Sequence, residues 1–341
     1  MKGKVLVLCG TGSIGSYTVK ELLSLGYKVD VTTREDLVSD NENVRYFKTN
    51  SYDDNVLKEF FANNKYDTII DFSHYAPETY NEKLEFLAQN TDQLIFLSSY
   101  RVYADLEHPI KETSPQLIDV TNDSFLLNEE NYAMYKCGCE KVINASPYKN
   151  KVTIIRPIIS FYYKSLSLIT TPAPILIPRS LEGKKLLLPI EGKDVYAGYG
   201  WSGNTGKLIS RLVMNEKAMG EAFTISNGEN VTWGEIAEYY KEYLGTEYEW
   251  TDKDTYLKTG TLNTRADLFG LDDDRLLDRR IDVSKVLNVT GLTKDDLLSV
   301  KDALKYECER LMANKDTVLS YLNKLSSDII NQNLDTYFLK N

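Results

Sequence analysis

A glycine-rich segment near the start of the chain constrains the fold more than any other feature. Gly10, Gly12 and Gly15 directly follow the apolar run 4–9 and open a stretch, 13–25, with helical periodicity. Glycines at this spacing permit a tight turn, a close approach of the backbone to a pyrophosphate, and close packing of the helix on the strand. The first N–H groups of such a helix favour phosphate. The segment therefore predicts a dinucleotide-binding turn, and the alternative is a glycine-rich turn with no ligand; the residues expected to bind are Gly10, Gly12, Ser13, Ile14 and Gly15.

Strand-like and helix-like segments alternate through the first half of the chain. Such alternation is typical of βαβ units, which form a parallel sheet covered by helices on both faces. We therefore predict an α/β fold of the Rossmann type, with a doubly wound parallel sheet. The expected strands are 4–9, 28–33, 44–47, 68–72, 93–98 and 152–156, and the expected helices are 13–25, 54–63, 78–88 and 132–144.

The pattern loosens after residue 157, where prolines punctuate the sequence up to Gly200. A helix-like stretch and the strand-like segment 221–225 then indicate a return to the sheet. We expect a dinucleotide-binding domain of residues 1–160 with a return segment 200–228. A smaller C-terminal substrate-binding lobe is expected from residues 161–199 and 229–341.

Charge and composition narrow the classes of function. The formal net charge is −10, with both signs spread along the chain, which argues against nucleic acid as a partner. No run of about 18 apolar residues occurs and the N-terminus leads directly into a strand, so neither a membrane span nor a signal peptide is expected. The four cysteines indicate reduced thiols in a cytoplasmic protein. With only His74 and His108, we expect no histidine-dependent triad and no metal site.

The end of the second expected strand bears on the choice of cofactor. An acidic residue there would accept hydrogen bonds from a ribose 2′-hydroxyl, whereas a basic residue accommodates a 2′-phosphate. The chain has Thr33 followed by Arg34 at this point, which favours NADP. Glu35 and Asp36 follow closely, so NAD remains open, and Arg34 could also be an ordinary solvated charge.

Four further motifs occur in a fixed order. They are S-S-x-x-V-Y at 98–103, Y-x-x-x-K at 132–136, R-P at 156–157 and D-x-S-K at 282–285. Together with the glycine-rich turn they resemble the extended short-chain dehydrogenase/reductase superfamily, of the NAD-dependent epimerase/dehydratase type. The resemblance implies a nucleotide-sugar as the small-molecule substrate, a homodimer formed through helices of the cofactor domain, and contact of Lys136 with the nicotinamide ribose.

The Y-x-x-x-K motif suggests acid–base chemistry. Tyr132 and Lys136 lie four residues apart and therefore share one face of a helix. A phenol is a weak base at pH 7, but a nearby ammonium and a cationic nicotinamide both favour its phenolate. Tyr132 could then exchange a proton with a substrate hydroxyl while Ser99, at a strand end, binds the reacting oxygen. The alternatives are that Tyr132 is a core aromatic, that Lys136 is a surface charge, or that the neighbouring Tyr135 is the functional tyrosine.

The chain departs from the family pattern at several positions. The family often begins its turn T-G-x-x-G-x-x-G, and Leu8-Cys9 stands at the T-G position. Asn50 stands where many members have an adenine-contacting aspartate. Tyr100 and Arg101 stand where 4,6-dehydratases carry an Asp-Glu pair, which argues against dehydration by that mechanism.

These observations predict an NAD(P)-dependent epimerase or reductase that acts on a hydroxyl or keto carbon of a sugar. The alternatives are a dinucleotide-binding sensor without turnover, which would not need Ser99, Tyr132 and Lys136, and an RNA-binding relative, which the net charge disfavours. Phe72 and Ser73 are expected near the cofactor. The candidate substrate contacts are His74, Tyr100, Arg279 and Arg280.

Overall fold

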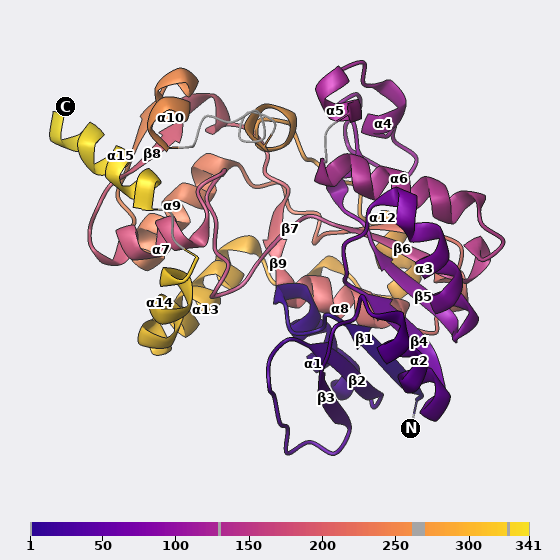
Figure 1. Ribbon diagram of the computed structural model, residues 1–341. Coiled ribbons are helices and arrows are strands. Elements are labelled where there is room, and N and C mark those ends of the chain that lie inside the picture. Colours follow the sequence, from indigo (N-terminus) through magenta and orange to yellow (C-terminus); the bar gives the residue numbers. More distant parts are fainter. Residues whose placement is uncertain (1, 129–130, 261–269, 326–327, 341) are drawn as a thin grey trace. The chain divides into compact units, whose positions relative to one another are not determined.

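The computed structural model describes residues 2–128, 131–260, 270–325 and 328–340, which belong to two compact units (Figure 1). Unit 1 consists of Met1–Ser160, Ser202–Asn227 and Ile281–Leu297. Unit 2 consists of Phe161–Trp201, Gly228–Arg280 and Leu298–Asn341. Within the described part of the chain, no helix combines the length and the apolar character needed to cross a membrane.

The described residues of unit 1 form a seven-stranded parallel sheet in the order β10-β6-β5-β4-β1-β2-β3. The strand order reverses at β1, which pairs with β2 on one side and β4 on the other; ligands bind at the carboxyl edge of such switch points. The arrangement confirms the predicted Rossmann-type doubly wound fold. The strands are β1 (Lys4–Leu8), β2 (Lys28–Thr33), β3 (Val44–Lys48), β4 (Tyr66–Asp71), β5 (Thr91–Leu97), β6 (Val152–Pro157) and β10 (Ala222–Ile225).

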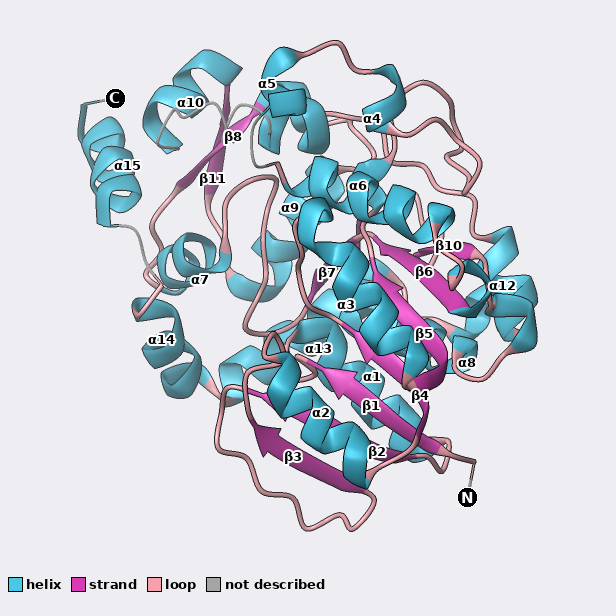
Figure 2. Cartoon of the chain, turned by 45° about the vertical axis from the view of Figure 1, so that its right-hand side comes forward, coloured by secondary structure: helices cyan, strands magenta, loops and turns pink. Residues whose placement is uncertain are grey.

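Helices cover both faces of this sheet (Figure 2). Side chains alternate between the faces of a strand, so Val5 and Val7 of β1 enter one core cluster while Leu6 and Leu8 enter another. Burial on both faces explains why β1 is an uninterrupted apolar run. The helices of unit 1 are α1 (Ser13–Ser24), α2 (Asp54–Asn63), α3 (Pro77–Gln89), α4 (Leu117–Val120), α5 (Ser124–Asn128), α6 (Tyr132–Ala145), α8 (Ser202–Leu212) and α12 (Ser284–Thr290), with short 3₁₀ turns η1 (Tyr100–Val102), η2 (Lys149–Lys151), η4 (Glu216–Ala218) and η6 (Lys294–Asp296).

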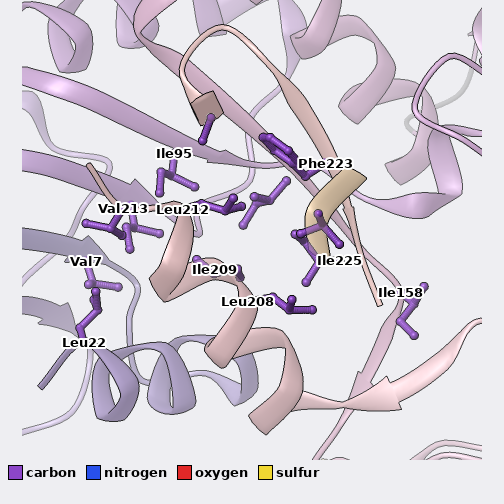
Figure 3. Close-up of a cluster of buried hydrophobic side chains, with 14 of the residues drawn as sticks. Val7, Leu22, Ile95, Ile158, Leu208, Ile209, Leu212, Val213, Phe223 and Ile225 are labelled. Atoms are coloured by element: carbon purple, nitrogen blue, oxygen red, sulfur yellow. The ribbon is translucent and has the colours of Figure 1, made fainter. Parts of the chain in front are cut away.

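Helix α8 returns to unit 1 and packs against α1. A Cβ atom at Gly206 would lie 2.6 Å from the backbone carbon of Tyr17, so only glycine permits this close helix approach. Leu208 and Ile209 of α8 join Val7 and Phe223 in the core (Figure 3). The return segment therefore completes the core on the α1 face of the sheet.

The segment Ile281–Leu297 also belongs to unit 1, whereas the sequence assigned all of 229–341 to the second lobe. The Asp282 N–H donates to the Ile110 carbonyl at 2.8 Å, and Lys285 forms an ion pair with Glu221 at 2.7 Å. Val286 is buried in the core of unit 1. Its burial, together with these contacts, holds α12 in unit 1.

Unit 2 consists mainly of helices. Its parallel strands β8 (Leu186–Pro189) and β11 (Tyr248–Thr251) pair with each other. Helix α9 (Trp233–Leu244) begins with a capping box formed by Thr232 and Glu235. The other elements around and within unit 2 are β7 (Ile159–Phe161), α7 (Ala173–Leu181), η3 (Ile190–Gly192), β9 (Tyr199–Trp201), α10 (Lys253–Gly260), the π-helical turn η5 (Leu271–Arg275), α13 (Val300–Ala313), α14 (Lys315–Asn323) and α15 (Asp328–Lys340).

Candidate active site

The glycine-rich turn lies at the carboxyl end of β1, and each glycine has a different environment. A Cβ atom at Gly10 would lie 2.7 Å from the Val31 side chain, and one at Gly15 would lie 2.6 Å from the Gly10 carbonyl oxygen. Neither position can accept a side chain without movement of the turn. A Cβ at Gly12 would meet no atom within 4 Å, so the space beside this residue is open.

The N-terminus of α1 suits an anion. Gly12 is its N-cap and supplies no capping side chain, and the first turn contains no acidic residue. The backbone N–H groups of Ser13 and Ile14 lack acceptors within the helix, because they precede its first hydrogen bond. Open space beside Gly12, uncapped N–H groups and the positive end of the helix dipole together fit a dinucleotide pyrophosphate.

The last residue of β2 is not acidic, although Glu35 and Asp36 follow shortly after it. Thr33 occupies the strand end, where its hydroxyl lies 3.1 Å from the Thr11 hydroxyl, and the exposed Arg34 follows. The nearest acid within the strand is Asp30, which is buried and pairs with Arg45 at 2.7 Å. The choice between NAD and NADP stays a prediction.

Asn50, expected near the adenine, caps a local turn. Its side-chain oxygen accepts a hydrogen bond from the Tyr52 N–H at 3.1 Å. The Tyr52 hydroxyl in turn accepts from the His74 N–H at 3.1 Å. The loop after β3 is thus joined to the loop after β4 at the same edge of the sheet.

Ser99, Tyr132 and Lys136 come together at the carboxyl edge of the sheet. Ser99 follows β5 and caps η1, accepting a hydrogen bond from the Arg101 N–H at 3.2 Å. Asn131 caps α6 by accepting from the Ala133 N–H at 2.8 Å, which places Tyr132 at the first position of that helix. Ser99 lies near enough to the Tyr132 hydroxyl to lower its pKa.

Burial around the hydroxyl raises the pKa of Tyr132, while the charge of Arg101 and the nearby Ser99 hydroxyl lower it. The residue as a whole is 39% exposed, so Tyr132 is not a core aromatic. Desolvation disfavours the phenolate and the two neighbours favour it. The arrangement allows Tyr132 to hold or release a proton at an accessible position.

Lys136 lies one turn after Tyr132 and is only 1% exposed, so it is not a surface charge. Its Nζ donates to the Leu97 carbonyl at 2.6 Å and to the Ser73 carbonyl at 3.4 Å. The same atom lies 5.7 Å from the centroid of the Tyr132 ring. Burial lowers the pKa of Lys136 to about 8, because the cation is removed from water.

The segment after β4 lies beside these residues. Ser73 is buried, and its N–H donates to the Asp71 carboxylate at 2.9 Å. Phe72 is half-buried. The imidazole of His74 stacks on the Tyr132 ring at 5.4 Å and on the Tyr135 ring at 5.6 Å. His74 therefore contacts the catalytic candidate itself, a contact that the sequence did not reveal.

Burial and the charge of Lys136 lower the pKa of His74. The imidazole is therefore neutral at pH 7. It lies against Tyr132 as an uncharged aromatic surface.

The two residues after Ser99 differ in their placement. Tyr100, predicted to contact the substrate, is 2% exposed and belongs to the hydrophobic core of unit 1. The ring packs in the core, and its contact with a substrate stays a prediction. The guanidinium carbon of Arg101 lies 5.8 Å from the Tyr132 ring centroid. The basic residue two positions after the serine is the sequence signal for this contact.

Arg279 and Arg280, the other predicted substrate contacts, lie in unit 2. Arg279 is buried, and its backbone N–H donates to the Tyr196 carbonyl at 3.0 Å. Arg280 forms an ion pair with Asp278 at 2.7 Å. Both arginines thus have protein partners within unit 2, and their role toward a substrate stays a prediction.

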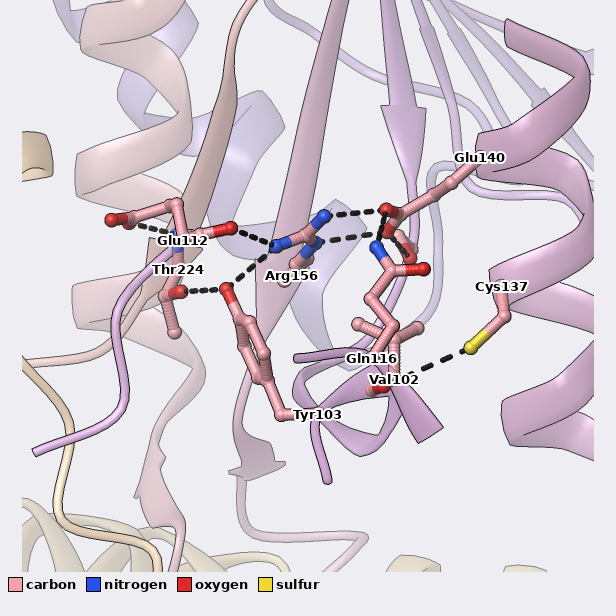
Figure 4. A network of polar contacts seen from close by, with 9 residues as sticks. Val102, Tyr103, Glu112, Gln116, Cys137, Glu140, Arg156 and Thr224 are labelled. Carbon is pink, nitrogen blue, oxygen red and sulfur yellow. Dashed lines mark hydrogen bonds and ion pairs between the residues drawn. The ribbon is translucent and has the colours of Figure 1, made fainter. Parts of the chain in front are cut away.

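A buried polar network fixes α6 against the sheet (Figure 4). Arg156 donates to the Glu140 carboxylate at 2.9 and 2.5 Å and to the Tyr103 hydroxyl at 2.9 Å. Ser98 also donates to Glu140, and the Tyr103 hydroxyl lies 2.6 Å from that of Thr224. The network thus ties α6, which carries Tyr132 and Lys136, to the strand that precedes Ser99.

Among the described residues no group of three His, Cys, Asp or Glu side chains is placed to hold a metal ion.

Residues 5–158 match the family model described as NAD dependent epimerase/dehydratase family, which confirms the resemblance predicted from the motifs. No curated protein sequence matches this chain.

Several solved structures share the fold across the chain. An epimerase from Methanothermobacter thermautotrophicus matches with a TM-score of 0.71 and 15% identity, over 93% of this chain and 94% of that chain. A UDP-glucose 4-epimerase from Bifidobacterium longum in complex with NAD+ and UDP matches with a TM-score of 0.64 and 17% identity, over 92% and 99%. A UDP-glucuronic acid 4-epimerase from Bacillus cereus in complex with UDP-glucuronic acid and NAD matches with a TM-score of 0.64 and 14% identity, over 95% and 100%.

Proposed function

We propose that this chain, whose residues 5–158 match the NAD dependent epimerase/dehydratase family model, is an NAD(P)-dependent enzyme that acts on a hydroxyl or keto carbon of a nucleotide-linked sugar. The observation that carries the proposal is that Ser99, Tyr132 and Lys136 come together at the carboxyl edge of the sheet, with the Lys136 Nζ 5.7 Å from the centroid of the Tyr132 ring. A protein that only bound a dinucleotide would not need this group of residues.

Unit 1 would hold the dinucleotide. The pyrophosphate would lie on the turn of Gly10, Gly12, Ser13, Ile14 and Gly15, since the N–H groups there are uncapped. Arg34 and Asn50 would face the adenosine half, while Phe72, Ser73 and Lys136 would lie along the nicotinamide half. When bound, the nicotinamide would supply hydride transfer to and from the substrate carbon.

The side chains of the site would manage the proton. Ser99 would donate a hydrogen bond to the reacting oxygen of the substrate and fix its position. Tyr132 would take the proton of the substrate hydroxyl as the keto group forms and return it in the reverse direction. Lys136, held by two backbone carbonyls, would add positive charge near the phenolate and orient the ribose.

The remaining parts of the proposal concern the substrate and the assembly. We propose that the regions 161–199, 229–280 and 298–341 contribute the substrate-binding lobe, with Arg279 and Arg280 as candidate contacts to phosphate. The NAD and UDP-sugars named for the similar structures support a nucleotide-sugar substrate and NAD as cofactor, whereas Arg34 favours NADP. A cytoplasmic homodimer is proposed from the family resemblance alone.

Gly12 provides a direct test of dinucleotide binding. A Cβ atom at this position would meet no atom within 4 Å, so Gly12→Val is expected to fold normally and to occupy the space beside the pyrophosphate. We expect the wild type to bind NAD or NADP in calorimetry and Gly12→Val to lose at least about tenfold in affinity. An unchanged urea midpoint for Gly12→Val provides the folding control. The proposal fails if the wild type binds neither dinucleotide.

A second measurement separates the two reaction types. The protein is purified, denatured, and its released small molecules are identified by mass and absorbance. Copurified NAD, retained through purification, favours an epimerase; an exchangeable NADP favours a reductase. Thermal shifts against a panel of nucleotide-sugars would then identify the substrate.

A further inference from the structure

The proposed reaction assigns no role to Arg101. It lies in η1, two residues after Ser99, and its backbone N–H donates to the Ser99 hydroxyl oxygen at 3.2 Å. Its guanidinium carbon lies 5.8 Å from the centroid of the Tyr132 ring, within the range in which a cation acts on an aromatic ring. One residue therefore acts on both Ser99 and Tyr132.

The sequence predicts that Lys136 stabilises the phenolate of Tyr132. In the structure its ammonium also binds two backbone carbonyls. Its Nζ donates to the carbonyls of Leu97 and Ser73 at 2.6 and 3.4 Å. Burial lowers the pKa of Lys136 to about 8, so part of its charge is lost at mildly alkaline pH. A guanidinium keeps its charge throughout this range.

We propose that Arg101 is a positioning residue that stabilises the phenolate of Tyr132 electrostatically and thereby sets the pH range in which Tyr132 can accept a proton. The inference rests on the proposed function of Tyr132 as the proton acceptor. Arg101 exchanges no proton and forms no bond in the reaction. Its contribution is a permanent positive charge near the ring whose oxygen becomes negative.

Within the part of the chain that the structure describes, the other groups around Tyr132 do not provide this permanent charge. Ser99 is neutral, and His74, which stacks on the ring, is uncharged at pH 7 because burial and Lys136 lower its pKa. The acids Asp71 and Glu140 and the thiol Cys139 act on the Lys136 ammonium and raise its pKa.

The test uses three variants of the full chain. Arg101→Gln removes the charge, Arg101→Lys retains it, and Lys141→Gln removes a half-exposed cation of α6 that pairs with Asp119 at 2.7 Å. Each protein is labelled with fluorotyrosine, which titrates at lower pH than tyrosine, and followed by fluorine NMR. The Tyr132 signal is identified by its loss in Tyr132→Phe.

We expect the Tyr132 signal of Arg101→Gln to titrate about one pH unit higher than in the reference protein. In Arg101→Lys the Tyr132 signal should titrate at nearly the same pH as in the reference protein, and in Lys141→Gln its titration should not shift. An unchanged titration in Arg101→Gln overturns the proposal, as does an equal shift in Lys141→Gln. This readout needs no substrate, so it separates the proposal from the fate of the proposed function.

The pH profile of kcat/KM gives the kinetic counterpart. Arg101→Gln should lose about tenfold in kcat/KM at pH 7 and regain it as pH rises, because one pKa unit corresponds to a tenfold change in phenolate. A loss of the same size at every pH would mean a merely structural role and would overturn the proposal. If no substrate is turned over by the wild type, the proposed function fails while the NMR titration still decides the role of Arg101.

Discussion

Cys9 holds the backbone of the glycine-rich turn in the left-handed region, with φ of 55°. Many relatives of this type are expected to have glycine here, as the first glycine of T-G-x-x-G-x-x-G, and the positive φ gives the physical reason. A residue with a Cβ pays about 1–2 kcal/mol in this region, whereas glycine does not. The thiol lies 3.6 Å from the Ser73 hydroxyl and 3.7 Å from the Ser51 hydroxyl; a thiol forms only weak hydrogen bonds, so these contacts offset little of that cost.

Cys9→Gly should therefore stabilise the protein. Relief of the left-handed conformation outweighs the extra entropy of glycine in the unfolded chain. We expect the free energy of unfolding, measured in urea, to rise by about 0.5–1 kcal/mol. Cys9→Ala is the matched control, since it loses the thiol but keeps the Cβ. A Cys9→Gly protein no more stable than Cys9→Ala would show that the turn carries no backbone strain at this residue.

Lys136 makes stability depend on pH. Burial lowers its pKa from 10.5 to about 8 in the folded protein, so between these values the unfolded chain binds more protons than the folded one. Stability from this group therefore rises with pH across the window. Below pH 8 the buried cation destabilises the fold in full, and the penalty disappears as pH approaches 10.5.

We predict that the free energy of unfolding of the wild type, measured relative to that of Lys136→Met, rises by up to about 3 kcal/mol between pH 7 and about pH 10. Both proteins are measured by urea unfolding. The difference between the two proteins cancels the other titrating groups. A difference independent of pH would mean that Lys136 is not desolvated in the folded state.

At the scale of elements, α6 positions the site because it packs closely on α3. A Cβ atom at Gly138 would lie 2.4 Å from Cγ and 2.8 Å from Cβ of Pro77, the first residue of α3. The helix can approach only because this residue is glycine. Tyr132 and Lys136 lie on the same helix, so any displacement of α6 moves both of them.

Gly138→Ala is expected to lower stability by about 1–3 kcal/mol through overpacking and to lower kcat/KM by misplacing Tyr132. Stability is measured by urea unfolding and activity on the identified substrate. Lys141→Ala, at a half-exposed position of α6, should change neither by a comparable amount. Wild-type values for Gly138→Ala would exclude α3 as the element that positions α6.

The sequence could predict the elements because their signals are local. Alternation of strands and helices predicted the sheet, and the four-residue spacing predicted that Tyr132 and Lys136 share a helix face. Contacts between distant segments have no such signal, and the stacking of His74 on Tyr132 and the carbonyl partners of Lys136 appear only in the structure. Tyr100 and Arg101 are neighbours in one 3₁₀ turn, and the packing of the core decides that Tyr100 turns inward.

At the scale of the whole molecule, the dinucleotide-binding unit is assembled from three separate stretches of chain. The return segment supplies β10, which pairs with β6, and α8, which packs on α1. The D-x-S-K segment supplies α12, which the sequence had assigned to the other lobe because nothing local distinguishes a helix that packs on unit 1. The first 160 residues therefore lack part of their own core.

We predict that residues 1–160 expressed alone do not fold cooperatively. They lack the partners of β6 and α1, including Leu208, Ile209 and Phe223, so a large apolar surface would face water. Urea unfolding followed by near-ultraviolet circular dichroism should show a sharp transition for the full chain and none for the fragment. A cooperative fragment that also binds dinucleotide would contradict this account of unit 1.

The central claim is that Tyr132 exchanges the proton in a nicotinamide-dependent reaction, and Tyr135 offers a matched comparison because His74 stacks on both rings with the same interplanar angle of 19°. The most direct measurement is turnover and dinucleotide affinity of Tyr132→Phe and Tyr135→Phe on the identified substrate. We predict that Tyr132→Phe loses at least about 100-fold in kcat with little change in dinucleotide Kd, while Tyr135→Phe stays close to the wild type. Turnover that survives in Tyr132→Phe, or is lost instead in Tyr135→Phe, would contradict the claim.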